Sequence, residues 1–509
     1  MNTTNQQLIS KLLGTLLTTL LIASPILAQE GEVGIFQGRA DIGDVGQAGS
    51  TGYDAKSQVY TLEGSGDNMW FGEDAFHYLY RKISGDFILR TRAEFLENKG
   101  ESNFHRKMGW VVRTSLDPGS PHVNAALHGN GLAALQFRRS PGDSTYEIRS
   151  AVTGADVVQL ERQGSTYLLS VARFGDTFTT DTLVDLDLGD EVYVGLYVCA
   201  HDNEGTEQAR FRNTRIVKPA GDDLVPYQDY LGSNLEMMNV DNGHRTIIYR
   251  HPQSIQAPNW TPDDRGLIYN HNGLLFYYDL QQDRPEVIDT DFAINNNNDH
   301  VLTLDGTMLG ISHHTEDAGG ASIVYTMPAE GGVPRRVTEK GPSYLHGWSP
   351  DNRFLTYTGL RNDEYDIYII PAEGGEEIRL TTAPGLDDGS EYTPDGRYIY
   401  FNSVRTGSME IWRMRPDGTE QEQLTDDRLN NWFPHISPDG RRVVFLSYPE
   451  TVAPSDHPFY KRVYLRMMPL DGGEPRVIAY LYGGQGTINV PSWAPDSRRI
   501  SFVSNTGLN

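Results

Sequence analysis

The sequence predicts an all-β protein with two domains, an N-terminal antiparallel β-sandwich followed by a six-bladed β-propeller. Three observations predict this fold. The 509 residues exceed what one ordinary hydrophobic core accommodates. The 52 glycines and 27 prolines suit a chain with many tight turns, while long amphipathic helical patterns are scarce. A Pro-Asp turn motif recurs through the second half at the spacing of propeller blades.

The overall charge excludes one class of function. A formal net charge of −25 disfavours nucleic-acid binding, because that function needs clustered Lys and Arg to displace counterions. The single cysteine, Cys199, excludes an intrachain disulfide and lies in an apolar strand pattern. We interpret it as a packed thiol rather than a nucleophile.

Residues 1–28 are predicted to be a secretory signal peptide. Lys11 precedes an apolar run, and Ile26, Leu27 and Ala28 end in a small residue suited to cleavage. The run is too short to span a membrane, so no transmembrane segment is expected after signal removal. The sequence therefore predicts a periplasmic or secreted protein.

Residues 29–217 contain many strand-length alternating runs broken by Gly, Asp and Pro, which predict an antiparallel sandwich. The later runs, at 158–167, 192–201 and 209–216, resemble the last strands of concanavalin-like, lectin-type jelly-roll sandwiches found on many secreted carbohydrate-active proteins. That resemblance implies a sugar-binding face carrying exposed aromatic residues. Aromatic side chains in strands more often fill the core, and we favour that interpretation. The aromatic and histidine side chains concerned are Trp70, Phe71, His77 and Tyr78.

Residues 218–232 are rich in Pro, Gly and Asp and are predicted to be a linker, with the propeller at 233–509. In each repeat Pro sets φ for a turn, Asp accepts backbone hydrogen bonds, and Gly or Asn tolerates a left-handed conformation. The six turns start at Trp260, Thr303, Trp348, Tyr392, Ile436 and Trp493, about 42 to 46 residues apart except for the last step.

The last repeat ends soon after its turn, with one strand at 500–504. Its outer strands must come from elsewhere, and residues 235–249 have the pattern of two strands joined by a turn. The first segment is therefore expected to close the ring with the last, which removes exposed sheet edges. All six repeats resemble those of the TolB family.

The innermost strand of each blade precedes the Pro-Asp turn and lines the central channel. Residues three or four positions before the Pro are therefore expected to converge on one mouth. These residues are Asn259, His300, His346, Ser390, Glu391, His435 and Ser492. His300, His346, Glu391 and His435 have the donor atoms to hold a divalent metal such as Mn, Ca or Zn. The three histidines are alternatively candidate catalytic bases, because imidazole titrates near neutral pH.

Two kinds of segment add candidate substrate-binding residues. One is the polar loops that enter the same strands, and the other is a long insertion before the final blade that could close over the mouth. These candidate residues are Asn259, Asp299, Tyr344, Asp387, Asp388, Trp432, His457, Lys461, Arg462 and Asn489. The alternative is a purely structural role, in which the His and Asn side chains that line the channel contact water and connect neighbouring blades. His271, His313 and His314 lack such convergence and are interpreted as structural.

Two functions remain open from the sequence. The placement of histidines before Pro-Asp turns is similar to that in oligogalacturonate lyases, and this resemblance implies a metal-assisted site acting on an acidic sugar. The first hypothesis is therefore a protein that binds carbohydrate, or binds and cleaves it, at an axial site. The second is a non-enzymatic scaffold that docks envelope proteins, as the resemblance to TolB implies.

Overall fold

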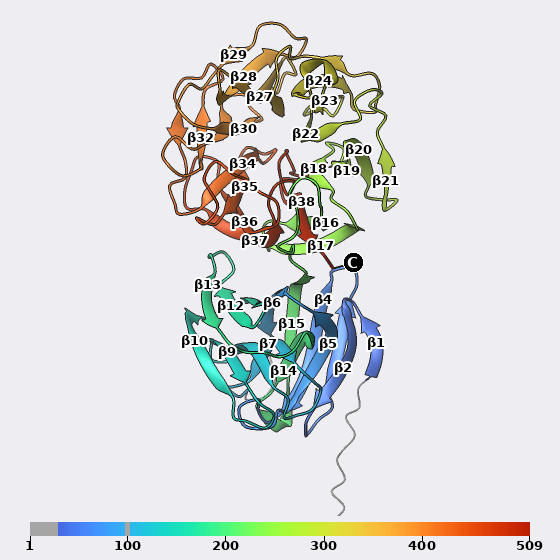
Figure 1. The fold of residues 1–509 in the computed structure, drawn as a ribbon, viewed down its shortest axis with the longest axis vertical. Coiled ribbons are helices and arrows are strands. Elements are labelled where there is room, and N and C mark those ends of the chain that lie inside the picture. The colour runs from blue at the N-terminus through green and yellow to red at the C-terminus, as the bar shows by residue number, and fades with distance from the viewer. Residues whose placement is uncertain (1–28, 97–101, 509) are drawn as a thin grey trace, which may run out of the picture.

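The structure, a computed structural model, describes residues 29–96 and 102–508, so the predicted signal peptide lies outside the described residues. Within these ranges all regular elements are β-strands except one short 3-10 helix, η1 (Glu316–Ala318). Figure 1 shows two lobes, with the N-terminal sheets below and a ring of small sheets above. No helix in the described ranges combines the length and apolar character that a membrane crossing needs.

The lower lobe consists of two antiparallel sheets. The first has eight strands in the order β1 (Gln29–Val33), β2 (Phe36–Ile42), β5 (Phe76–Ser84), β14 (Glu191–Cys199), β7 (Lys107–Arg113), β8 (His122–His128), β9 (Leu132–Arg138) and β10 (Tyr146–Thr153). The second has seven in the order β13 (Thr179–Leu183), β12 (Thr166–Ala172), β11 (Val157–Gln163), β6 (Phe87–Phe95), β15 (Asp202–Val217), β4 (Val59–Gly66) and β3 (Ser50–Asp54).

Both sheets contribute to one hydrophobic core. Trp110 and Leu196 from the first sheet lie in the same cluster as Leu89 and Phe211 from the second. Apolar residues on the facing sides of the two sheets thus leave water together, which is the main stabilising effect in such a pair. Tyr78 and His77 are buried, whereas Phe71 is 64% exposed. The resemblance to lectins stays a prediction.

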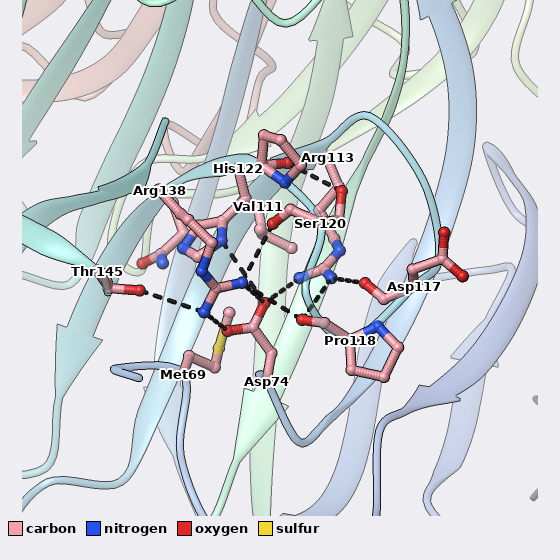
Figure 2. Close-up of polar contacts among 12 residues, drawn as sticks. Met69, Asp74, Val111, Arg113, Asp117, Pro118, Ser120, His122, Arg138 and Thr145 are labelled. Carbon is pink, nitrogen blue, oxygen red and sulfur yellow. Dashed lines mark hydrogen bonds and ion pairs between the residues drawn. The ribbon is translucent and has the colours of Figure 1, made fainter. Parts of the chain in front are cut away.

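A fully buried ionic cluster fastens one end of the first sheet (Figure 2). Asp74, just before β5, pairs with Arg113 of β7 at 2.5 Å and with Arg138 of β9 at 2.7 Å. His122 of β8 lies 3.5 Å from the same carboxylate, and all four side chains are fully buried. Burial alone would raise the pKa of Asp74, but His122 and the two arginines hold it below its usual value. The cluster therefore joins one loop to three neighbouring strands.

The upper lobe is a six-bladed β-propeller, as predicted. Five blades have four strands each, numbered from the centre outward. Blade 1 is β18 (Gln256–Trp260), β19 (Gly266–His271), β20 (Leu274–Asp279) and β21 (Arg284–Val287); blade 2 is β22 (Asn296–Leu302), β23 (Met308–His314), β24 (Ser322–Pro328) and β25 (Arg335–Arg336). Blade 3 is β26 (Ser343–Trp348), β27 (Phe354–Arg361), β28 (Glu364–Pro371) and β29 (Ile378–Arg379); blade 4 is β30 (Asp387–Tyr392), β31 (Ile399–Ser403), β32 (Glu410–Met414) and β33 (Glu422–Gln423); blade 5 is β34 (Asn430–Ile436), β35 (Arg442–Tyr448), β36 (Lys461–Pro469) and β37 (Arg476–Gly483).

The sixth blade is closed by strands from both ends of the domain, which confirms the predicted closure. β16 (Gly232–Asn239) lies between β17 (His244–His251) and β38 (Arg499–Thr506), with Leu235 opposite Val503. A single bridge between Trp493 and Ile500 supplies the innermost position. The ring is thus sealed by backbone pairing between residues 260 to 274 positions apart in the chain.

Candidate functional site

A cavity of about 930 Å³ lies on one face of the propeller, where the inner strands begin. Amide side chains dominate its wall, and they are Gln256, Asn270, Asn272, Asn295, Asn296, Asn297, Asn298, Gln485 and Asn489. Six aromatic rings also line it, namely Tyr227, Tyr230, Tyr344, Tyr365, Phe433 and Phe459. The titratable lining residues are Asp299, His314, His346, Asp388 and His457, together with the tyrosines. Among the described residues, no Lys or Arg lines this cavity. We call it the axial pocket.

Two segments outside the blades cover part of the axial pocket. The linker supplies Tyr227 and Tyr230, whose rings lie 5.3 and 5.8 Å from the ring of Phe459 in the loop between β35 and β36. The backbone N–H of Leu231 also donates to the hydroxyl of Tyr460 at 2.9 Å. The linker therefore helps to build the pocket in addition to joining the two domains.

The inner strands of blades 1 to 5 share an irregularity that determines which side chains face the pocket. Each pairing of the inner strand with its neighbour shifts register once, for example between Asp388 and Glu391 and between Trp432 and His435. At these shifts Ala257, Gly389 and Phe433 adopt φ values of 55°, 65° and 55°. Such bulges break the two-residue alternation of a strand, and left-handed residues other than Gly often occur at functional sites.

His346 and Asp388 form a buried pair in the pocket wall. The Nε2 atom of His346 lies 2.9 Å from Oδ1 of Asp388, which also accepts hydrogen bonds from the Thr358 hydroxyl and the Gly389 N–H. Burial disfavours the imidazolium, but Asp388 outweighs it and raises the pKa of His346. Burial would likewise raise the pKa of Asp388, yet His346 holds it at about 2. Each partner thus favours the charged form of the other, an imidazolium beside a carboxylate.

Asp299 and His457, in contrast, favour their neutral forms, because burial has the largest effect on the pKa of each. Burial raises the pKa of Asp299 to about 6, and the nearby charge of Asp388 adds to the rise while His346 opposes it. Burial lowers the pKa of His457. The pocket thus holds one carboxylate that stays ionised and one carboxyl that exchanges its proton near neutral pH, together with a histidine that favours its neutral form.

Six of the predicted site residues line the axial pocket: Asp299, Tyr344, His346, Asp388, His457 and Asn489. The amide of Asn489 donates to Gln485 at 2.8 Å, so its orientation is fixed by a second lining amide. The loop that was expected to close over the mouth does contribute His457. These residues come from the inner strands of blades 2, 3 and 4 and from two loops, and the ring arrangement brings them together.

Four other residues expected at the mouth lie between blades instead, namely Asn259, His300, Glu391 and His435. Asn259 donates to the carbonyl of Pro491 and accepts from the N–H of Leu302 at 2.9 Å. Glu391 likewise accepts from the N–H of Ile436 at 2.9 Å. Each of these contacts joins one blade to its neighbour.

Two histidines occupy similar buried positions. His435 contacts Glu391 through Nδ1 at 2.7 Å and the carbonyl of Ile488 through Nε2 at 2.5 Å. His300 contacts the carbonyl of Ile268 at 3.2 Å. Asn259, Glu391, His300 and His435 therefore do not line the axial pocket. In blades 4 and 5 the register shift of the inner strand comes directly before Glu391 and His435.

Four other predicted substrate-binding residues also lie outside the pocket lining. Asp387 pairs with Arg405 at 2.8 Å, and Trp432 is fully buried with its ring 4.5 Å from that of His457. Lys461 and Arg462 begin β36, and Arg462 pairs with Glu161 of the N-terminal domain. Trp432 therefore packs behind two lining side chains, His457 and Phe433, and the ring of Phe433 lies 5.6 Å away.

Of the four predicted metal ligands, Glu391 and His435 are in contact at 2.7 Å, whereas His300 contacts the carbonyl of Ile268 and His346 contacts Asp388. In the part of the chain that the structure describes, no group of three or more His, Cys, Asp or Glu side chains is placed to hold a metal ion. A site for Mn, Ca or Zn stays a prediction from the sequence alone.

Sequence reasoning missed several lining residues, among them Gln256, Tyr365, Phe433, Phe459 and the linker tyrosines. His314, interpreted as structural, also lines the pocket. Phe433 carried a usable signal, because it lies five residues before its Pro, the place that the predicted residue Asp299 holds in its own repeat. The linker tyrosines carried no such sequence signal, since their position in the pocket depends on how the two domains pack together.

The known proteins similar to this chain include a TolB propeller family and a putative TolB, in agreement with the observed fold. The family described as the TolB beta propeller domain matches residues 346–456. An uncharacterized protein of Agrobacterium fabrum, Atu1656, is 44% identical over 272 residues, which are 53% of this chain and 92% of that protein.

Two solved structures are also similar. The putative TolB from Agrobacterium tumefaciens has 43% identity, covers 54% of this chain and 99% of its own, and has a TM-score of 0.52. TolB from Acinetobacter baumannii has 15% identity, covers 64% of this chain and 80% of its own, and has a TM-score of 0.40, too low to support an inference about function.

Proposed function

This chain belongs, through its propeller, to the TolB-like β-propeller proteins, and from that premise we propose that the axial pocket binds a neutral oligosaccharide. The observation that carries the proposal is the wall of amide and aromatic side chains without Lys or Arg among the described residues. Amides both donate to and accept from sugar hydroxyls, while aromatic rings pack against the apolar faces of pyranose rings.

The amides are held in fixed orientations, which favours recognition over simple hydration. Asn298 donates to Gln256 at 2.9 Å, and Asn297 donates to the carboxyl of Asp299 at 2.7 Å. An amide that is already held by one partner loses little side-chain entropy when its remaining groups bind a ligand. Tyr344 and Tyr365 have ring centroids 6.5 Å apart and form one aromatic wall of the pocket.

The charges of the pocket favour a neutral sugar over an acidic one. The charge of His346 is already balanced by Asp388, and Asp299 becomes negative above pH 6. A uronate carboxylate would therefore be repelled at neutral pH without a cation to offset it. Cleavage of the bound sugar is a separate question, and the same assay answers it if products are analysed.

Replacing Tyr365 by Ala is expected to weaken binding of neutral oligosaccharides about tenfold, because one aromatic wall of the pocket is lost. Isothermal titration with a panel of neutral and uronic oligosaccharides measures the effect. Tyr398→Ala is the matched control, since Tyr398 packs under Arg413 and Arg415 away from the pocket. Preferential binding of uronic oligosaccharides would contradict the proposal.

The contrast between His346 and His435 provides a second test. His435→Ala removes contacts between blades and is expected to lower stability by about 1 to 3 kcal/mol with unchanged ligand affinity. His346→Ala is expected to weaken binding, because Asp388 loses its partner in the pocket wall. Urea unfolding and titration of both variants separate the two effects. Loss of affinity in His435→Ala alone would place the ligand between the blades instead.

The scaffold hypothesis uses the same surface, because fixed amides also recognise an extended peptide backbone. If no oligosaccharide binds, and an envelope protein is captured by the wild type but not by Tyr365→Ala, the pocket is a peptide site.

An exported location, periplasmic or secreted, is proposed from residues 1–28, and a lectin-like role for the N-terminal sheets from their strand pattern. Secretion of the full chain fused to a reporter tests the first of these.

A further inference from the structure

A second cavity, of about 340 Å³, lies between the two domains and is distinct from the axial pocket. Arg90, Leu168 and Phe178 of the N-terminal domain line one side, and Val463 and Tyr464 of blade 5 line the other. Its volume is near the lower end of the range of about 300 to 1,000 Å³ found for small-molecule sites. We call it the interdomain cavity.

The guanidinium of Arg90 is the unusual group in this cavity. It is 5% exposed, and its hydrogen bonds go to neutral oxygens, to Gln159 Oε1 at 2.6 and 2.8 Å and to the carbonyl of Tyr480 at 2.5 Å. Among the described residues Arg90 forms no ion pair with a carboxylate. A guanidinium has five N–H donors, so three hydrogen bonds leave two N–H groups.

Positive charge accumulates around Arg90 although the whole chain carries −25. Arg245 donates to the same Tyr480 carbonyl at 2.9 Å, but it is also paired with Glu236, as is Arg215. Arg462 is paired with Glu161. Four guanidinium groups thus meet two carboxylates at this interface. Burial, reinforced by repulsion from Arg245, lowers the pKa of Arg90 to about 9, although the charge of Glu161, which also lines the cavity, opposes this shift.

A buried cation without a counter-ion is costly unless an anion joins it. A carboxylate is the matching group, because its two oxygens accept the parallel N–H groups of a guanidinium. The rest of the cavity wall includes the apolar side chains of Leu168, Phe178, Val463 and Leu481. A ligand that fits both features has one carboxylate and a small apolar body.

We propose that the interdomain cavity binds a small organic carboxylate, which pairs with Arg90 and lays its apolar body against the aromatic and aliphatic side chains of both domains. Since residues of the two domains face the same ligand, binding also stabilises their contact. This site is independent of the axial pocket.

The test uses the full chain and two probes of the same shape, phenylacetate and its neutral amide, phenylacetamide. Isothermal titration is expected to show phenylacetate binding to the wild type, at least tenfold tighter than phenylacetamide. Arg90→Gln is expected to reduce phenylacetate affinity at least tenfold and to leave oligosaccharide binding at the axial pocket unchanged.

A second variant keeps Arg90 intact in case its replacement disturbs folding. Thr180, an exposed residue of β13, lines the cavity, so Thr180→Trp is expected to fill it and abolish phenylacetate binding. Thr179→Trp, next to it but outside the lining, is the control and is expected to bind normally. Absence of phenylacetate binding to the wild type up to about 10 mM, or equal affinity for both probes, would overturn the proposal.

Discussion

Replacement of Asp74 by Asn is expected to destabilise the N-terminal domain by about 3 to 5 kcal/mol, the largest loss we predict for a single residue. The side chain keeps its shape, but Arg113 and Arg138 lose the carboxylate that balances them. Both arginines are fully buried, so water cannot take its place. An uncompensated buried charge costs far more than the loss of an ordinary hydrogen bond.

Hydrogen exchange measures this loss in the N-terminal domain alone, through the backbone amides of β7, β8 and β9. The matched control is Glu191→Gln, which removes the exposed ion pair between Glu191 and Lys82 and is expected to leave exchange unchanged. Equal protection in Asp74→Asn and the wild type would show that the cluster does not stabilise the sheet.

The propeller was predictable because its information is local and repeated. Each Pro-Asp turn specifies a hairpin, six turns at one spacing specify a ring, and the short last repeat requires strands at 235–249 to close it. The Asp74 cluster was not predictable. Its members lie up to 64 residues apart, on one loop and three strands, and nothing in the spacing of Asp74 and Arg138 indicates that they meet.

The site was predictable only in part, for a physical reason. Counting back from the Pro identifies the inner strand correctly, and it leads to His346 and, through the adjacent loops, to Asp299 and Asp388. The same count fails for Glu391 and His435, because the bulge in each inner strand reverses the side that a residue faces. Bulges depend on backbone conformation, and only Gly389 marks one in the sequence.

Asp299→Asn is expected to stabilise the protein at neutral pH by about 2 to 3 kcal/mol, although it removes a residue of the pocket. The pKa of Asp299 in the folded protein is about 6, above its ordinary value of 3.8. Folding therefore opposes its ionisation. Below about pH 4 the wild type and the variant should have the same free energy of unfolding. As pH rises through 6, that of the wild type falls below that of the variant. The gain should thus be absent at pH 3.5 and complete at pH 7.5.

Asp388→Asn is the matched variant of opposite sign. Because the pKa of Asp388 is lowered to about 2, its ionised form stabilises the folded state above pH 4, and its loss should cost about 2 kcal/mol at pH 7.5. Urea unfolding of both variants at the two pH values measures the difference. A channel filled with water would ionise both carboxyl groups alike and give no such difference. Opposite signs from the two carboxyl groups would instead show a pocket in which burial opposes the ionisation of Asp299 while His346 favours that of Asp388.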